Sequence, residues 1–131
     1  MRNSKYLYLN TRDYFYRLDI NKIVLFEAQG NYTGFILSNK QKGVVGVNLS
    51  RMSAILSQSL GDKASQFARV GRNFIINLTL VYKIDVVKQC IVMSDGATFA
   101  FQLSTSKDAV RQLRDMFVNP LRKENKDNGN A

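Results

Sequence analysis

The sequence contains no histidine and only one cysteine, Cys90. The lack of histidine excludes the histidine-containing zinc sites and the Ser-His and Cys-His pairs on which many enzymes depend. One cysteine cannot form a disulfide within the chain, and Cys90 lies in an apolar stretch, which favours a small buried thiol. The carboxylates show no close metal-ligand spacing. These absences predict a protein that is not an enzyme and uses no metal, cofactor or small-molecule substrate.

Long apolar runs are also missing. The longest strongly apolar run spans residues 23–26, far below the ~18 residues typical of a membrane-spanning helix. The N-terminal residues alternate between polar and apolar types and lack the continuous ~7–15-residue apolar region of a signal peptide. We therefore expect a cytoplasmic protein without a membrane partner.

Positive charge is in excess. The 131 residues, 45% of them hydrophobic, suffice for one globular core, and 19 Lys and Arg residues face 10 Asp and Glu residues. Between residues 40 and 72 the only acid is Asp62, whereas the cations are Lys40, Lys42, Arg51, Lys63, Arg69 and Arg72. Such a cluster favours a polyanionic partner such as a nucleic acid, although a basic surface that only aids solubility fits the charge equally well. We take Lys40, Lys42, Arg51 and Lys63 as candidate phosphate contacts.

Short runs of β-branched and aromatic residues predict a mostly β fold of the α+β class. The predicted strands span residues 5–10, 13–19, 23–28, 32–38, 43–47, 67–70, 74–76, 81–87, 89–93 and 98–103. Their close spacing favours antiparallel hairpins, with tips at Gln29-Gly30-Asn31 and at Asp95-Gly96.

Two segments have helical periodicity. Residues 48–60 place apolar side chains near one face, with Asn48 as the N-cap and Gly61 as the end. A second helix is predicted over residues 106–118. The polar sequence after it is expected to form a disordered tail over residues 119–131, which leaves one domain over residues 1–118.

The pattern from residue 67 to residue 77 places cations and amides around Gly71, between two apolar strands. A tight bend there would project Arg72 and Asn73. Arginine can bond a guanine edge and asparagine an adenine edge, and either can hold phosphate oxygens. The alternative is a hairpin in which these side chains only satisfy backbone groups.

Paired tyrosines suggest a different function. Tyr6 and Tyr8, and likewise Tyr14 and Tyr16, alternate with the period of two that puts each pair on one face of a sheet. Such pairs could stack on unpaired bases, as in proteins that bind single-stranded nucleic acid. Cross-strand aromatic pairs that stabilise a half-buried sheet are the more common case.

Several segments, in order along the chain, resemble the LytTR domain, the DNA-binding output domain of LytR/AgrA-type bacterial regulators. These segments are residues 20–33 with Glu27-Ala28-Gln29-Gly30-Asn31-Tyr32, the helix that starts at Asn48, the pattern of residues 67–77 and the Asp95-Gly96 hairpin. The resemblance covers residues 4–118. It implies an elongated, multi-sheet antiparallel β fold of about ten strands with two or three short helices.

The resemblance also implies where DNA would be bound. In the family, loops rather than a recognition helix enter successive major grooves, and the contacts come from three places. These correspond here to Gln29, Asn31 and Tyr32, then Arg69, Arg72 and Asn73, then Thr105, Ser106 and Lys107.

The chain departs from the family pattern at the second and third places. The usual His and Ser of the second motif are Gly71 and Asn73, and the usual Ser-Arg before the last helix is Ser104-Thr105. The function expected is that of a stand-alone, sequence-specific transcriptional regulator that binds duplex DNA, with a second copy on a repeated site as a further partner. A protein-interaction module derived from the same fold is the alternative that these departures favour.

Overall fold

The computed structural model describes residues 5–129 of the chain. Within these residues there are ten strands, two α-helices and three short 3-10 helices. The strands are β1 (Tyr6–Asn10), β2 (Phe15–Asp19), β3 (Ile23–Gln29), β4 (Tyr32–Leu37), β5 (Lys42–Val45), β6 (Phe67–Val70), β7 (Phe74–Asn77), β8 (Val81–Asp85), β9 (Cys90–Ser94) and β10 (Ala100–Ser104). The helices are η1 (Ile20–Lys22), α1 (Leu49–Leu60), η2 (Gly61–Gln66), η3 (Leu78–Leu80) and α2 (Lys107–Gly129). The predicted mostly β architecture is confirmed, and every predicted strand is present with ends that differ by no more than two residues.

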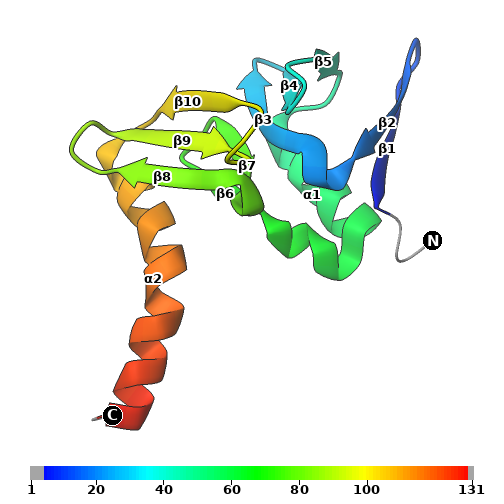
Figure 1. Cartoon of the computed structure of the whole chain (residues 1–131). Coiled ribbons are helices and arrows are strands. Elements are labelled where there is room, and N and C mark those ends of the chain that lie inside the picture. The colour runs from blue at the N-terminus through cyan, green and yellow to red at the C-terminus, as the bar shows by residue number, and fades with distance from the viewer. Residues whose placement is uncertain (1–4, 130–131) are drawn as a thin grey trace.

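The strands form three antiparallel sheets (Figure 1, coloured from blue at the N-terminus to red at the C-terminus). The central sheet has the order β5-β4-β3-β7-β6, while β1 pairs with β2 and a three-stranded sheet has the order β10-β9-β8. One hydrophobic cluster packs the β1–β2 hairpin and α1 against the central sheet. A second cluster packs the three-stranded sheet and the first turns of α2 against the same sheet.

Strand β3 is buried by both clusters. Ile23 and Phe26 belong to the first cluster, and Val24 and Leu25 belong to the second. A register shift between Ile23 and Leu25 accompanies this arrangement. Burial on two faces explains why residues 23–26 read as a continuous apolar run rather than an alternating one.

Helix α1 begins and ends as its sequence predicts. The side chain of Asn48 accepts a hydrogen bond of 2.8 Å from the Arg51 backbone N–H. Gly61 terminates the helix with a left-handed φ of 56°. Leu49, Met52 and Leu56 face the core.

The β9–β10 hairpin is confirmed, but its loop is longer than a two-residue Asp-Gly turn. Asp95 organises the loop, because its carboxylate accepts bonds from the Thr98 hydroxyl and from the backbone N–H groups of Ala97 and Thr98. These bonds hold the pKa of the Asp95 carboxyl well below its ordinary value, and the bond from the Thr98 hydroxyl has the largest effect.

The C-terminal segment differs from its prediction. Helix α2 was expected to end at residue 118 and to be followed by a disordered tail, whereas it continues through Pro120 to Gly129. A proline removes one backbone donor from a helix, and the Lys, Arg and Glu residues after it have high helix propensity.

In the described part of the chain, no helix combines the length and apolar character that crossing a membrane requires.

Candidate nucleic-acid interface

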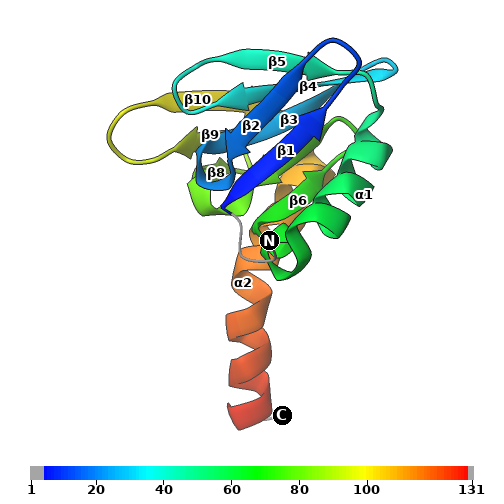
Figure 2. The same ribbon diagram turned by 90° about the vertical axis from the view of Figure 1, so that its right-hand side faces the viewer.

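The chain reversals that carry the three predicted contact places gather at one end of the central sheet. Gln29 pairs with Tyr32 across the β3–β4 turn, and Val70 pairs with Phe74 across the β6–β7 turn. The Ala28 N–H donates a 2.8 Å bond to the Asn73 carbonyl, which holds these two turns side by side. We call this end of the molecule the tip end. Figure 2 shows the β1–β2 and β3–β4 tips at the upper right, and the turns that join β4 to β5 and β9 to β10 at the left.

The β3–β4 turn exposes all three of its predicted contact residues, Gln29, Asn31 and Tyr32, to solvent. Gly30 adopts a left-handed φ of 65°, which lets two residues close the hairpin. The Gln29 side chain lies across the neighbouring strand, where a Cβ atom on Gly34 would collide with its amide. Asn31 and Tyr32 are exposed and are free to meet a partner.

The β6–β7 turn presents Arg72 and Asn73 to solvent. Gly71 provides the bend with a left-handed φ of 63°, and the guanidinium of Arg69 donates a 3.3 Å bond to the Arg72 carbonyl. Arg69 therefore braces the turn, while the Arg72 side chain makes no ion pair with any described residue. The predicted tight bend is confirmed.

The third contact place, at the start of α2, lies directly against the second. A Cβ atom on Gly71 would approach the Thr105 hydroxyl oxygen to 3.1 Å and the Ala109 Cβ to 3.5 Å. Ser106 caps α2, since its hydroxyl accepts a 3.1 Å bond from the Ala109 N–H. The two places line a groove of about 640 Å³. Lys107, the first residue of α2, is exposed beside it.

The structure does not bring all the phosphate candidates to this end. Arg51 lies in the first turn of α1, which starts near the β3–β4 turn because Thr33 pairs with Val45 just before the helix. Lys42 pairs with Ile36 at the other end of the central sheet, and Lys40 lies in the turn beyond it. Lys63 lies in η2, after α1 has run to that same other end. Of the four candidate phosphate contacts, Arg51 therefore lies near the contact loops, whereas Lys40, Lys42 and Lys63 lie toward the other end of the central sheet, because each hairpin reverses the direction of the chain.

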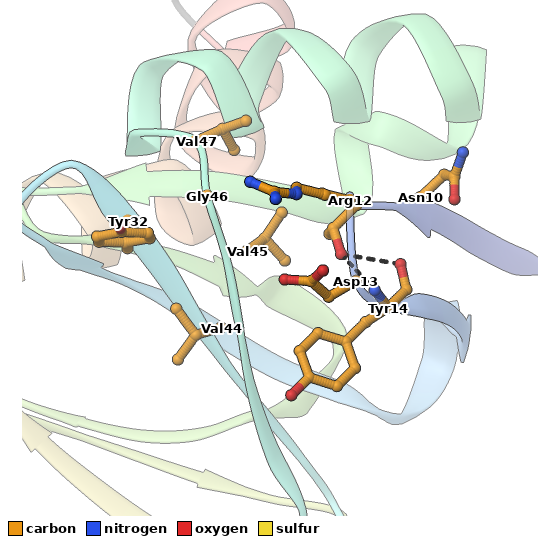
Figure 3. Close-up of a pocket in the computed structure, with 10 residues that line it drawn as sticks. Asn10, Arg12, Asp13, Tyr14, Tyr32, Val44, Val45, Gly46 and Val47 are labelled. Atoms are coloured by element: carbon orange, nitrogen blue, oxygen red, sulfur yellow. Dashed lines mark hydrogen bonds between the residues drawn. The ribbon is translucent and has the colours of Figure 1, made fainter.

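Sequence reasoning missed Arg12. It lies in the β1–β2 loop, which borders a pocket of about 550 Å³ at the tip end together with Tyr32 and the segment of residues 44–47. In Figure 3 the Arg12 side chain extends from the hairpin toward Gly46 and Val47. The sequence shows that Arg12 lies between two predicted strands. It does not show that Arg12 lies at the tip end, because that depends on how the β1–β2 hairpin packs beside the central sheet.

The tyrosine pairs do not form one stacking platform. Tyr6 and Tyr8 lie on the outer face of the β1–β2 hairpin, with ring centroids 6.3 Å apart. Tyr16 faces inward and packs edge-on against Phe35 at 4.9 Å. Tyr14 stacks on Tyr16 at 6.0 Å. Because the two pairs lie on opposite faces, one strand of bases could not stack on both.

Comparison with known proteins agrees with the fold. The family model of the LytTr DNA-binding domain matches residues 13–117. The chain belongs to the LytTR family of DNA-binding domains. A solved LytTr DNA-binding domain from Bacillus cereus is 17% identical and has a TM-score of 0.59, with 88% of this chain and 98% of that chain covered. No curated protein sequence matches the chain.

Membership of the LytTR family makes this a domain of the DNA-binding, transcription-regulating type and not a member of an enzyme family. Across the described ranges of this LytTR domain, no group of three or more cysteine or acidic side chains lies close enough to hold a metal ion.

Gly71 offers a test of the contact between the second and third places. We expect Gly71→Ala to lower the free energy of unfolding by about 1–2 kcal/mol, because it forces a side chain into the left-handed region. We also expect it to weaken DNA binding at least fivefold, because the new Cβ displaces Thr105. Gly96→Ala is the matched control, since Gly96 has a left-handed φ of 83° but no neighbour within 4 Å. Chemical denaturation and fluorescence anisotropy would measure both; equal loss of DNA binding in the two variants would contradict the expectation.

Proposed function

We propose that this LytTR domain binds duplex DNA sequence-specifically through its tip end, with loops in the major groove. The observation that supports this most is the convergence of three loop segments, distant in sequence, on one exposed end. The same end gathers cations from five segments: the β1–β2 loop (Arg12), the start of α1 (Arg51), the β6–β7 hairpin (Arg69 and Arg72), the β8–β9 turn (Lys88), whose Gln89 carbonyl accepts a bond from the Thr105 N–H, and the start of α2 (Lys107). The major groove of B-DNA, about 12 Å wide, admits a two-stranded β-ribbon and therefore the tip of a hairpin.

The tip end offers two kinds of contact. Arg72, Asn73 and Asn31 are exposed and carry the donors and acceptors that read base edges. Gln29 and Tyr32 flank them on the β3–β4 turn. The cations Arg12, Arg51 and Lys107, and the N-terminal end of α2 next to Thr105 and Ser106, are suited to phosphates. Lys40, Lys42 and Lys63 lie away from the tip end and are not assigned a direct contact with DNA.

The proposal predicts a steep dependence of DNA affinity on salt. Each phosphate neutralised contributes about −0.9 to the slope of log affinity against log salt concentration, so four to six contacts give a slope of about −4 to −5. Anisotropy titrations of a labelled duplex measure the slope. The salt concentration would run from about 50 to about 300 mM, which includes physiological ionic strength. An affinity that does not change with salt, or a single strand bound more tightly than its duplex, would count against duplex binding through this surface.

Selection of binding sites from random duplexes tests specificity. We expect a recovered motif at physiological salt, and a motif repeated at a fixed spacing if two copies bind together. Recovery of sequences without any common motif would leave only non-specific binding and would favour a protein-interaction role for the fold.

A further inference from the structure

An apolar groove lies away from the tip end, between the central sheet and the three-stranded sheet. Its volume is about 370 Å³, within the range of small-molecule sites. Val24, Ile36, Phe99 and Phe101 supply apolar walls, and Lys40 and Lys42 lie at its edge. We call this the lysine groove. No acidic side chain is among the residues that line it.

Lys40 adopts a backbone conformation that favours glycine. Its φ is 75°, and its N–H donates a 2.8 Å bond to the Leu37 carbonyl, while the Leu37 N–H donates a 2.9 Å bond to the Gln41 carbonyl. This is the hairpin position at which glycine is the usual residue. A lysine there costs stability, and such a cost points to a use for the side chain.

The alternative explanations account for less of this arrangement. Lysine on an edge strand such as β5 discourages pairing with other chains, but that role makes no demand on Lys40 in its turn. Contact with DNA phosphates does not require apolar walls, and the groove lies at the opposite end of the central sheet from the contact loops.

We propose that the lysine groove binds a small amphipathic anion, of the class of a medium-chain aliphatic carboxylate. The apolar walls would take the hydrocarbon chain, because burial of each CH₂ group is favourable. The ammonium groups of Lys40 and Lys42, which make no ion pair with any residue that the structure describes, would take the carboxylate in a charge-assisted bond. The site is independent of the proposed DNA-binding surface, and its test contains no DNA.

Decanoate is the probe, titrated into the full chain below its micellar concentration and followed by calorimetry. We expect saturable binding of one decanoate per chain, and at least tenfold weaker binding of decanol, which has the same chain without the charge. Lys42→Gln should weaken decanoate binding at least fivefold.

Lys40→Gly tests the role of the Lys40 side chain in a variant that is expected to fold well. Glycine suits the left-handed turn, so we expect an unchanged or higher melting temperature together with at least fivefold weaker decanoate binding. The proposal is overturned if decanoate shows no one-site saturation, if decanol binds as tightly as decanoate, or if neither lysine substitution changes the affinity.

Discussion

Asn77→Ala is expected to lower the free energy of unfolding by on the order of 3 kcal/mol, a large fraction of the stability of a domain of this size. The Asn77 side chain is fully buried. Its amide donates bonds of 2.9 Å to the Ile23 carbonyl and 3.4 Å to the Ile20 carbonyl. Its oxygen accepts bonds from the Thr79 N–H and hydroxyl at 3.0 and 2.7 Å.

The expected loss is large because truncation leaves partners on both sides without a bond. The Ile23 carbonyl would lose its bond in a buried site, at about 1–3 kcal/mol, and the Thr79 N–H would lose a part-buried bond at a smaller cost. Asn77 also joins the end of β7 to the turn before β3, more than 50 residues away in sequence. The substitution therefore weakens a long-range connection as well as a local turn.

Urea denaturation of Asn77→Ala measures the effect, with Asn21→Ala as the control. Asn21 belongs to the same network, since its side-chain oxygen accepts a 3.0 Å bond from Gln66, but that bond is exposed. We expect a loss of less than about 1 kcal/mol for Asn21→Ala. Asn77→Asp should also destabilise, because it removes the donor and sets a carboxylate against buried carbonyls. Wild-type stability in Asn77→Asp would show that the donor bonds do not hold this connection.

The elements of the fold could be predicted because local chemistry specifies them. The Asn48 cap, the Gly61 end of α1 and the Gly30 turn each depend on neighbours in sequence. The five-residue loop organised by Asp95 could not be predicted, since it requires several backbone N–H groups to converge on one carboxylate. The continuation of α2 past Pro120 was not predicted, because the residues after it lack apolar periodicity, although several of them have high helix propensity.

The candidate site was predictable residue by residue but not as a surface. Sequence alone suggested that Arg72 and Asn73 project from a bend, and the structure agrees. It could not show that Gly71 packs against Thr105, because that contact depends on how α2 docks on β6. Nor could it separate Arg51 from Lys42, which lie at opposite ends of the central sheet. Charge clustering in a chain of hairpins is a poor guide to charge clustering in space.

Arg72 is the residue from which a base-specific contact is most strongly expected. Its side chain is exposed at the tip of the β6–β7 turn and makes no ion pair with the residues the structure describes. The bond from Arg69 goes to the Arg72 backbone carbonyl, so the turn keeps its brace when the Arg72 side chain is removed. Truncation of Arg72 should therefore change recognition without changing the fold.

Arg72→Ala is expected to weaken binding to the preferred duplex by about 1–3 kcal/mol, or about 5- to 150-fold, because a bidentate contact with a guanine edge has that value. Repeated site selection with the variant should also show relaxed preference at one position of the motif. Lys22→Ala makes the same change of charge away from the tip end, next to the start of β3, and should change affinity less than twofold. Loss of affinity with an unaltered motif would assign Arg72 to a phosphate, and a lower melting temperature would assign it to the fold. A folded Arg72→Ala protein with wild-type affinity and motif would remove Arg72 from the interface, because the contact that the β6–β7 turn makes with DNA would then require only its backbone and Asn73.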